Sequence, residues 1–346
     1  MRAITLVPGK EGTLGVTEVP EPRPRAGELL VQGLALGICG TDRELNSGEY
    51  GWPREEPMIL GHESLGRVLQ IPEGSAYSPG DLVVGVVRRP DPEPCPACAM
   101  GEFDMCRNGE YTERGIKELD GYGSERWTVE AGYAVRIDPA LGTLGVLVEP
   151  TSVVAKAWEH IERIGARAWF EPQTVLVTGA GPIGLLAALL GVQRGLDVHV
   201  LDRATEGVKS ALVADLGATY HSGAALESIG FKPDIIIEAT GAGPLVMEAM
   251  LNTAAAGIVC LTGVSSGGRT LSVDAGQVNR DIVLENDVVF GSVNANLRHY
   301  RAAAKALTEA DHRWLERLIT RRLPLDRALE AFEPSDDVKV IIELEG

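Results

Sequence analysis

One glycine-rich segment limits the folds open to this chain more than any other feature. Gly179, Gly181 and Gly184 follow a β-branched run at residues 174–177 and precede a long apolar stretch that ends at Gly195. The first glycine permits a tight turn, the second lets the backbone approach a pyrophosphate, and the third lets a helix pack closely on a strand. The segment therefore predicts a strand, a turn and a helix whose N-terminus binds the phosphates of a dinucleotide.

Strands and helices alternate along the chain around this segment. Expected strands lie at residues 174–177, 197–201, 234–237, 257–261 and 288–290, and expected helices at residues 183–194, 206–216 and 244–253. Continuous β-branched strands that alternate with helices are typical of a parallel sheet covered on both faces. We predict an α/β fold in which residues 156–296 form a Rossmann-type, doubly wound parallel-sheet domain.

The remaining sequence indicates a second domain. Residues 1–155 are rich in Pro, Gly and short apolar runs of strand length, which favours irregular, mostly antiparallel β-structure. From about Leu297 the chain looks helical, and it ends in a strand at residues 339–342 that we expect to return to the first domain. Because 346 residues exceed what one hydrophobic core usually organises, we predict a β-rich domain over residues 1–155 and 297–346.

The charge balance and the start of the chain argue against two classes of partner. The formal net charge is −17 at pH 7, and an anionic surface repels nucleic acid and acidic lipid. The N-terminal residues do not have the pattern of a cleaved secretory leader, and no apolar run approaches the roughly 18–20 residues of a membrane span. We expect a cytoplasmic protein with neither nucleic acid nor membrane as a partner.

The five cysteines favour metal binding over disulfide bonds. Their number is odd, and Cys95 and Cys98 form a Cys-x-x-Cys pair, which in a cytoplasmic chain argues for metal ligands. Cys260 lies inside an apolar strand and is interpreted as a core residue.

A group of widely spaced residues has the composition of a zinc site. Cys39, His62 and Glu149 supply a thiolate, an imidazole and a carboxylate, and Glu63 is adjacent to the histidine, either as a ligand or behind one. Catalytic zinc usually has three protein ligands and an open position. Thr41 is placed to accept the proton of an alcohol. Each residue alone has an ordinary structural interpretation, but together with the glycine motif they indicate metal-assisted, nicotinamide-dependent oxidation of an alcohol.

The residues after the second strand bear on the choice of nicotinamide cofactor. Asp202 ends that strand about twenty residues beyond the glycines, where a carboxylate accepts hydrogen bonds from the ribose hydroxyls and repels a 2′-phosphate. Asp202 therefore favours NAD. Arg203 could pair with that phosphate, so NADP stays open.

The chain resembles the zinc-dependent medium-chain dehydrogenases along essentially its whole length. The residues that carry this resemblance are 37–42 (GICGTD), 60–63 (LGHE) and 179–184 (GAGPIG). Three further stretches resemble the glucose 1-dehydrogenase branch, namely residues 149–150 with 154–159 (VAKAWE), 109–116 (GEYTERGI) and 291–296 (GSVNAN).

The resemblance implies a GroES-like β-rich catalytic domain beside the Rossmann domain. It also implies zinc-dependent oxidation of an aldose, D-glucose first, at C1 to the lactone, with NAD or NADP as the acceptor. A polyol or secondary-alcohol dehydrogenase of the same family is the alternative, and a non-catalytic zinc- and nucleotide-binding relative is a further one. The resemblance further implies that the chain forms a homodimer or homotetramer.

The resemblance also assigns substrate and cofactor positions. Thr41, Glu113, Glu149 and Asn294 match positions that contact the sugar. The predicted cofactor-binding residues are Gly179, Gly181, Pro182, Ile183, Gly184, Asp202, Arg203, Leu261, Thr262, Gly263, Ser292, Val293 and Asn294.

The cysteine-containing lobe departs from the family pattern. Members with a second zinc carry four cysteines, of which this chain has the last three, Cys95, Cys98 and Cys106. The first position falls on Pro92, which cannot bind metal. Asp91, in preference to Glu93, could complete a tetrahedral structural zinc site. The alternative is a lobe without metal that leaves surface thiols or a redox pair.

Overall fold

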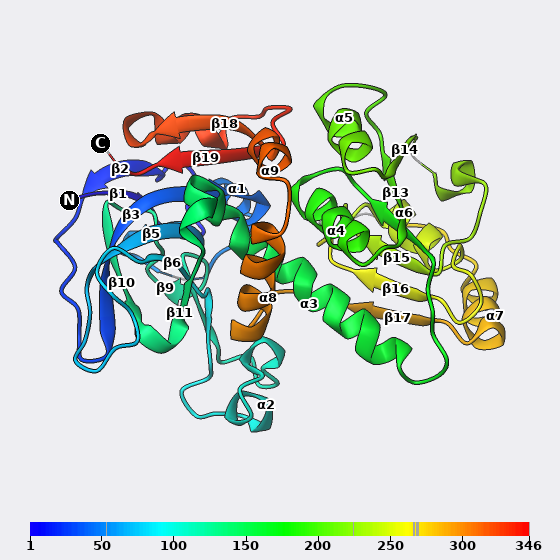
Figure 1. The fold of residues 1–346 in the computed structure, drawn as a ribbon, viewed down its shortest axis with the longest axis horizontal. Helices are drawn as coiled ribbons and strands as arrows, with labels where there is room; N and C mark the ends of the chain where they lie inside the picture. Colours follow the sequence, from blue (N-terminus) through cyan, green and yellow to red (C-terminus); the bar gives the residue numbers. More distant parts are fainter. Residues whose placement is uncertain (53, 224, 266, 268–269, 346) are drawn as a thin grey trace. The chain divides into compact units, whose positions relative to one another are not determined.

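The computed structural model describes residues 1–52, 54–223, 225–265, 267 and 270–345 (Figure 1). The chain divides into two compact units, of which the first comprises Met1–Ser152 with Asn294–Gly346 and the second Val153–Val293. The predicted domain boundaries fell after residues 155 and 296, whereas the compact units change after residues 152 and 293.

The first unit is built on β-sheets. Its strands are β1 (Arg2–Leu6), β2 (Gly15–Glu18), β3 (Glu28–Ile38), β4 (Met58–Ile59), β5 (Glu63–Gln70), β6 (Leu82–Gly85), β7 (Arg88–Arg89), β8 (Thr112–Arg114), β9 (Glu118–Leu119), β10 (Arg126–Glu130), β11 (Ala134–Arg136), β18 (Ile319–Pro324) and β19 (Lys339–Glu343). The largest sheet has the order β11-β6-β5-β3-β19-β18, with β10 also paired to β3, and two smaller sheets have the orders β2-β1-β4 and β7-β8-β9. The strand expected at residues 339–342 does return to this sheet, because β19 pairs antiparallel with β3.

Short helices connect these strands. They are α1 (Gly40–Ser47), α2 (Pro96–Ala99), α8 (Leu297–Thr308) and α9 (His312–Leu318), with 3-10 helices at Phe103–Met105, Ala131–Tyr133, Pro139–Leu147 and Leu325–Phe332. The chain passes from the first unit to the second within α3 (Val148–Gly165). The core of the first unit packs around Tyr122 and Trp127, whose ring centroids lie 4.7 Å apart.

The second unit is the predicted parallel sheet. Its strands are β12 (Thr174–Thr178), β13 (Asp197–Asp202), β14 (Thr219–Ser222), β15 (Ile235–Glu238), β16 (Ile258–Leu261) and β17 (Val288–Gly291), in the order β14-β13-β12-β15-β16-β17. Its helices are α4 (Pro182–Gln193), α5 (Val208–Asp215), α6 (Gly243–Ala249) and α7 (Ala275–Glu285), with a 3-10 helix at Leu226–Ile229. All pairings are parallel, as predicted.

Both faces of this sheet are covered. On one face, Leu176 and Ile236 form a buried cluster with Leu245 of α6. On the other face, Gly191 of α4 packs on Val175 of β12, and a Cβ added to Gly191 would lie 3.4 Å from Cγ1 of the valine. Burial on both faces explains why the central strands β12, β15 and β16 are apolar along most of their length rather than alternating.

Three elements differ from the sequence expectations. β14 and α7 were not predicted, and β18 lies in a segment expected to be helical. None of the residues of α7 is buried. In β18 the buried residues include Ile319 and Leu323, and a spacing of four fits a helix as well as a strand.

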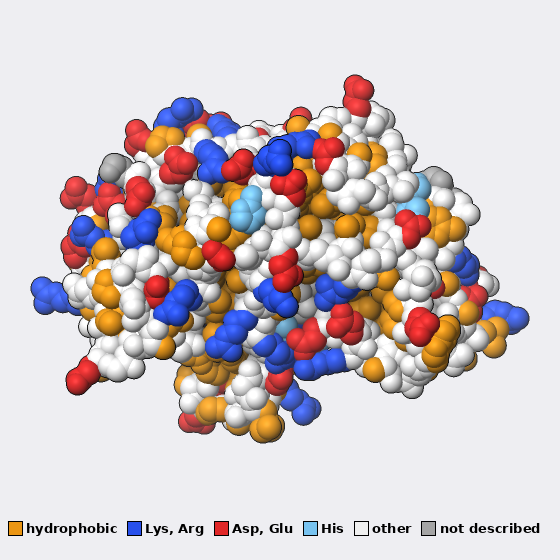
Figure 2. Space-filling view, in the orientation of Figure 1, with side chains coloured by type: hydrophobic (Ala, Val, Ile, Leu, Met, Phe, Trp, Pro, Cys, Tyr) orange, Lys and Arg blue, Asp and Glu red, His pale blue; other side chains and the backbone are white. Residues whose placement is uncertain are grey.

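One helical stretch among the described residues, Pro139–Gly165, is long and apolar enough to cross a membrane by length and composition, and the sequence analysis did not single it out. Of its 18-residue apolar window, 78% is buried inside the protein, which is the behaviour of a core helix. On the face shown in Figure 2, acidic and basic side chains are interspersed, so the net charge is not gathered there into one patch of a single sign.

Candidate functional site

The end of β3 and the start of β5 bring together the first predicted metal ligands. Gly37 of β3 lies opposite Glu63 of β5, so Cys39 and His62, just beyond these positions, are neighbours in space. The Sγ atom of Cys39 lies 3.1 Å from Nε2 of His62. Cys39 also caps the N-terminus of α1, and its backbone N–H donates to Oδ2 of Asp42 at 2.9 Å.

Two glycines make this approach possible. Gly61 has a φ of +98°, which favours glycine, and a Cβ there would lie 2.6 Å from side-chain atoms of Leu36. A Cβ on Gly37 would collide with the Glu63 carboxylate. The glycines in the two predicted motifs therefore have a packing reason next to the residues that carry the chemistry.

Glu149 joins the same region from the first turn of α3. Its carboxylate and the ligand atoms of His62 and Glu63 all lie within 4.8 Å of one another, and so do those of Cys39, Asp42 and His62. His62 is common to both groups, although neither group contains Cys39 and Glu149 together. Sulfur, imidazole and carboxylate donors gathered around one histidine, with Cys39 half-buried and His62 and Glu63 buried, fit a zinc ion.

Burial and neighbouring charges raise the pKa values of three of these groups. Burial raises the pKa of the Cys39 thiol, and burial with the nearby Glu63 raises the pKa of Glu149 to about 7. Burial alone would lower the pKa of His62, but the charges of Asp42 and Cys39 hold it well above its ordinary value. Without metal this cluster therefore retains protons, which a divalent cation would displace on binding.

Two charged residues that sequence analysis missed support the predicted ligands. Asp42 is fully buried with its Oδ1 atom 3.4 Å from Nδ1 of His62, which leaves Nε2 of the histidine facing Cys39. Lys339 forms a buried ion pair with Glu63. Each of these residues had a sequence feature that could have revealed it. Lys339 is a charged residue at the start of a mostly apolar strand, and Asp42 lies in the first helical turn after Cys39.

The residues matched to sugar contacts divide into two places of the first unit. Thr41 lies half-buried in the first turn of α1, two residues after Cys39. Glu113 of β8 is buried, and its Oε1 accepts a hydrogen bond from Nδ2 of Asn294 at 2.5 Å. Two residues far apart in the sequence, both predicted to contact a sugar, are thus in direct contact with each other.

The glycine-rich turn has the predicted geometry in the second unit. Gly179 has a φ of +92°, Gly181 is the N-cap of α4, and a Cβ on Gly184 would collide with the carbonyl oxygen of Gly179. Pro182 and Ile183 form the first turn of α4. The free N–H groups of this helix start are the phosphate-binding element that the motif predicts.

Asp202 at the end of β13 is held against this turn. Its Oδ2 accepts from the backbone N–H of Ala180 at 2.7 Å, and its Oδ1 from that of Ala204 at 3.0 Å. Lys209 of α5, which sequence analysis missed, lies 3.7 Å from Oδ2, and Arg203 is exposed. The carboxylate is therefore fixed beside the glycine-rich turn, where a ribose would be recognised.

The remaining predicted cofactor contacts follow the ends of β16 and β17. Leu261 is the last residue of β16, and the backbone N–H groups of Thr262 and Gly263 both donate to the carbonyl of Glu238. Ser292 and Val293 follow β17, and Nζ of Lys156 donates to the carbonyl of Val293 at 3.0 Å. These positions lie at the carboxyl ends of the strands, the edge at which parallel sheets bind ligands.

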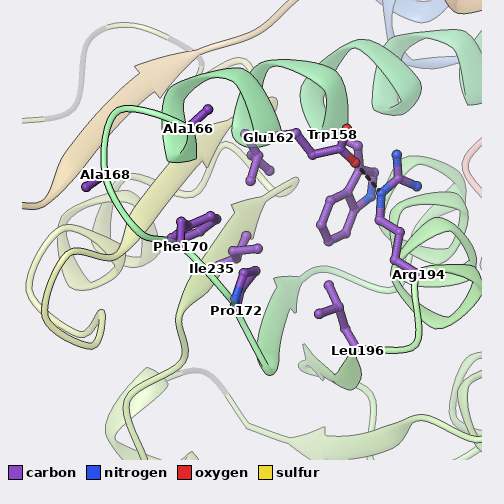
Figure 3. Close-up of a pocket in the computed structure, with 10 residues that line it drawn as sticks. Trp158, Glu162, Ala166, Ala168, Phe170, Pro172, Arg194, Leu196 and Ile235 are labelled. Atoms are coloured by element: carbon purple, nitrogen blue, oxygen red, sulfur yellow. Dashed lines mark hydrogen bonds and ion pairs between the residues drawn. The ribbon is translucent and has the colours of Figure 1, made fainter.

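A cavity of about 390 Å³ in the second unit lies elsewhere (Figure 3). Its lining includes Pro172, before β12, and Ile235, the first residue of β15, so it lies at the amino ends of the strands. Trp158 and Arg194 face each other in it, with the guanidinium carbon 4.8 Å from the ring centroid. None of the predicted site residues lines this cavity.

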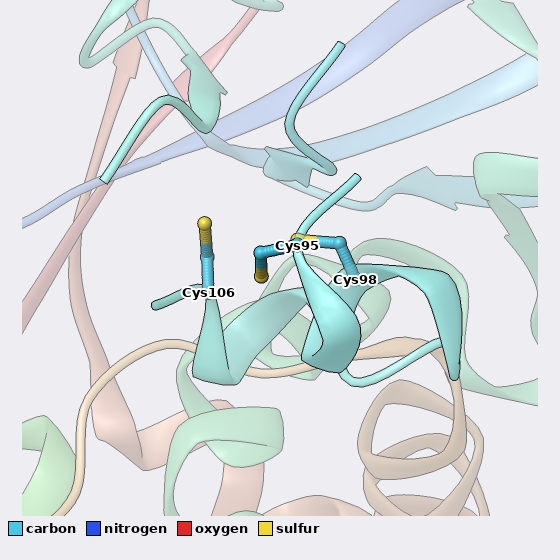
Figure 4. Close-up of side chains that lie close together, drawn as sticks. All are labelled: Cys95, Cys98 and Cys106. Carbon is cyan, nitrogen blue, oxygen red and sulfur yellow. The ribbon is translucent and has the colours of Figure 1, made fainter. Parts of the chain in front are cut away.

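The three cysteines of the lobe come together as predicted (Figure 4). The sulfur atoms of Cys95, Cys98 and Cys106 all lie within 4.8 Å of one another. The backbone N–H of Arg107 donates to Sγ of Cys95 at 3.4 Å, and this bond with others from nearby backbone N–H groups lowers the pKa of Cys95 to about 6. Burial instead raises the pKa of Cys98 to about 11. A compact cluster of three sulfur atoms is suited to a metal ion, which would displace the remaining thiol protons on binding.

Asp91 lies next to this cluster but outside the group of three sulfur atoms. Its Oδ1 accepts from the backbone N–H of Glu93 at 2.9 Å, and its Oδ2 accepts from Nδ2 of Asn108. Sγ of Cys106 in turn lies 3.0 Å from Oδ1 of Asn108. The Asn108 side chain, which sequence analysis missed, thus connects the Asp91 carboxylate to the Cys106 thiol.

Comparisons with known proteins cover the whole chain. Residues 25–139 match the model of the alcohol dehydrogenase GroES-like domain, and residues 142–344 match that of the glucose dehydrogenase C-terminus. The glucose 1-dehydrogenases of Methanocella arvoryzae and Thermoproteus tenax are 40% and 39% identical, over 99% of both chains in the first case and 100% in the second. A structure of Haloferax mediterranei glucose dehydrogenase in complex with NADP, Zn and gluconolactone superimposes with a TM-score of 0.92 at 34% identity, over 100% of both chains.

Proposed function

The chain belongs to the glucose dehydrogenase family of zinc-dependent medium-chain dehydrogenases, and on that premise we propose that it oxidises an aldose, D-glucose first, at C1 to the aldonolactone with NAD or NADP as hydride acceptor. The observation that carries the proposal is the convergence of the Cys39 thiol and the Glu63 and Glu149 carboxylates on His62. The relatives named as glucose 1-dehydrogenases support the substrate. The relative bound to NADP, Zn and gluconolactone supports the cofactors and the product.

The residues that would hold the catalytic zinc are Cys39, His62, Glu149 and Glu63. When bound, zinc makes the substrate hydroxyl more acidic, and the nicotinamide accepts the hydride. The Asp42 carboxylate, with Oδ1 3.4 Å from Nδ1 of His62, favours a proton on Nδ1 and so keeps the Nε2 lone pair available as a ligand. In the net reaction the C1–H bond supplies the hydride and the hydroxyl proton leaves to solvent, with Thr41 as the first acceptor of that proton.

The polar residues Glu113 and Asn294 are the proposed sugar contacts. Each sugar hydroxyl taken out of water needs a replacement hydrogen-bond partner, and a carboxylate beside an amide offers both an acceptor and a donor. In the second unit, the residues around Gly179, Asp202 and Gly263 are the proposed cofactor contacts.

We extend the proposal to a second, structural metal in the cysteine lobe. Cys95, Cys98 and Cys106 supply three thiolates, and Asp91 completes the tetrahedron after releasing Asn108. The lobe has few apolar residues to hold it, so a metal ion would take the place of a core there.

An assembly of identical chains is also part of the proposal. β17 is the last strand in the order of the six-stranded sheet, and α7 has no buried residue among those described. Val283 and Leu284 of this helix are 62% and 65% exposed. An open strand edge beside exposed apolar side chains suits a contact with a second copy of the chain. The cytoplasmic location and the lack of nucleic-acid and membrane partners stay predictions.

A substrate panel tests the proposed activity. Zinc-loaded protein is assayed with glucose, galactose, xylose, sorbitol and simple alcohols, each with NAD and with NADP. We expect the aldoses to have the highest kcat/KM. Faster turnover of sorbitol would favour the polyol alternative, and a lack of turnover with every compound would favour the non-catalytic one.

A further inference from the structure

A buried arginine lies directly behind one of the proposed sugar contacts. Arg88 of β7 is paired with Glu113 of β8, and each side chain is only 7% exposed. Nε and Nη2 of Arg88 lie 3.0 and 2.9 Å from Oε1 of Glu113, and Nη1 donates to the carbonyl of Asp104 at 3.1 Å. The guanidinium carbon lies 3.7 Å from the centroid of the Tyr111 ring. Hydrogen bonds and ring stacking therefore hold the guanidinium in one orientation.

This arginine controls which oxygen of Glu113 remains for a ligand. Oε1 accepts from Arg88 and from Nδ2 of Asn294, whereas no hydrogen bond from a described residue reaches Oε2. Asn294 is fixed as well, because its Oδ1 accepts from the backbone N–H of Ala295 at 2.7 Å and its φ is +61°. Oε1 is thus occupied within the protein, and Oε2 is the acceptor left for an incoming hydroxyl.

We propose that Arg88 is a positioning residue for substrate specificity, which fixes the Glu113 carboxylate so that Oε2 accepts a hydrogen bond from one hydroxyl of the aldose. The inference rests on the proposed function, since it takes Glu113 and Asn294 as sugar contacts. Arg88 acts through Glu113 and does not itself touch the sugar. A lysine cannot replace it, because one ammonium group cannot reproduce the planar set of donors to Glu113 and Asp104 or the stacking on Tyr111.

The next residue provides a matched control. Nε and Nη2 of Arg89 donate to Oε2 of Glu130 at 3.1 and 2.7 Å, and Nη1 donates to the carbonyl of Val86 at 2.7 Å. The guanidinium carbon lies 4.3 Å from the centroid of the Tyr133 ring. Arg89 is as buried as Arg88 and makes the same kinds of contact, but with a carboxylate outside the proposed sugar site.

The experiment compares Arg88→Lys, Arg89→Lys, Glu113→Gln and the double variant of Arg88→Lys with Glu113→Gln, all zinc-loaded, with glucose and its monodeoxy analogues. Arg88→Lys is expected to raise the KM for glucose about 10- to 100-fold, the effect of one misplaced hydrogen bond to a charged group. The KM for the nicotinamide cofactor should stay within about twofold of the wild-type value, and Arg89→Lys should leave the KM for glucose within the same limit.

The deoxy analogues identify a positioning role as opposed to a general loss of structure. For the analogue that lacks the hydroxyl bound by Glu113, Glu113→Gln should leave the KM at its wild-type value for that analogue. Arg88→Lys should leave the KM for the same analogue unchanged as well. In the double variant, Arg88→Lys should add little to the KM of Glu113→Gln. A KM change in Arg88→Lys no larger than in Arg89→Lys, or full additivity in the double variant, would overturn the proposal.

Two further measurements cover the cases in which Arg88→Lys does not fold or the wild type has no activity. If Arg88→Lys does not fold, Tyr111→Leu removes only the half-buried ring under the guanidinium and should raise the KM for glucose in the same direction, and an unchanged KM would count against Arg88. Wild-type protein that oxidises no aldose would refute the proposed function before any variant is compared. Once wild-type turnover is established, the variants decide on Arg88 alone.

Discussion

Lys339 and Glu63 form an ion pair inside the first unit, where at most 2% of either side chain is exposed. Nζ of Lys339 also donates to the carbonyl of Ile38 at 3.1 Å. The lysine therefore connects β19 to the end of β3, next to Cys39, and to the first residue of β5, next to His62. One buried cation thus joins the three strands around the proposed zinc ligands.

Removing this cation should destabilise the protein strongly. Lys339→Met leaves the Glu63 carboxylate buried without its partner, and the loss of one member of a buried pair costs about 3–5 kcal/mol. We expect the free energy of unfolding, measured by denaturant titration of metal-free protein, to fall by that amount. Combining Lys339→Met with Glu63→Gln removes the charge left behind and should restore much of the loss. Equal stability of Lys339→Met and the wild type would show that the pair is solvated in solution.

His62 is the residue common to both groups of candidate ligands, so its removal should separate catalysis from cofactor binding. We expect His62→Ala to abolish turnover, with a loss of at least about a thousandfold in kcat, because the zinc loses its imidazole ligand. Binding of NAD, measured by calorimetry, should be largely unchanged. Turnover retained by metal-free protein would contradict the zinc mechanism.

The sequence predicts those parts of this protein that depend on local pattern. The turn around Gly179 and the apolar strands of the second unit were expected, because a glycine motif and β-branched runs leave few alternatives. The approach of Cys39 to His62 follows from strand pairing. Cys39 comes just after β3, His62 comes just before β5, and these two strands pair antiparallel. β18 was wrongly expected to be helical, since its buried residues Ile319 and Leu323 have a spacing that both structures allow.

Contacts between distant segments could not be predicted in the same way. Nothing near Lys339 in the sequence indicates that it pairs with Glu63, because β19 reaches that carboxylate only through its pairing with β3. Arg88 and Asn294 are likewise far apart in the sequence, but both donate hydrogen bonds to Oε1 of Glu113. Such polar contacts have no sequence period, so only the fold reveals them.

Asp202 should decide the preference between the two nicotinamide cofactors. Its carboxylate is fixed beside the glycine-rich turn and would repel a 2′-phosphate. We expect Asp202→Asn, which keeps the size of the side chain and one of its two acceptor oxygens, to raise the ratio of kcat/KM for NADP to that for NAD about tenfold, or ~1.4 kcal/mol. Arg203→Ala is the opposing control and should lower that ratio. If both variants leave the ratio unchanged, the ribose lies elsewhere.

The cysteine lobe should hold one metal ion that is independent of catalysis. Cys106→Ser removes one of three clustered thiols, so we expect the metal content to fall from two ions per chain to one, with a lower melting temperature and largely retained turnover. Asp91→Asn should lower the metal content in the same way. Glu93→Gln, a change at the neighbouring acidic residue, should not. Two ions retained in Asp91→Asn would assign the fourth position to another donor.

Glu149 should give the metal-free protein a stability that falls as the pH rises. Burial raises the pKa of this carboxyl to about 7, from an ordinary value of 4.5, so the folded protein binds the proton more tightly than the unfolded chain does. Its contribution is complete below pH 4.5 and is lost as the pH rises through 7, in total roughly 3 kcal/mol. Glu149→Gln cannot ionise and lacks this loss.

Unfolding of chelator-treated protein at pH 5, 6, 7 and 8 measures this effect. The raised pKa of His62 gives a loss of the same sign that is present in both proteins. The difference between the wild type and Glu149→Gln therefore reports the carboxyl group together with its interaction with His62. We expect the variant to gain in stability relative to the wild type from pH 5 to about pH 7, with the difference levelling off towards pH 8. With zinc bound the wild type should show the opposite trend, because the metal competes with the proton for Glu149 and binds more tightly as the pH rises. Parallel pH profiles for the two metal-free proteins would mean that Glu149 is ionised in the folded protein throughout this range.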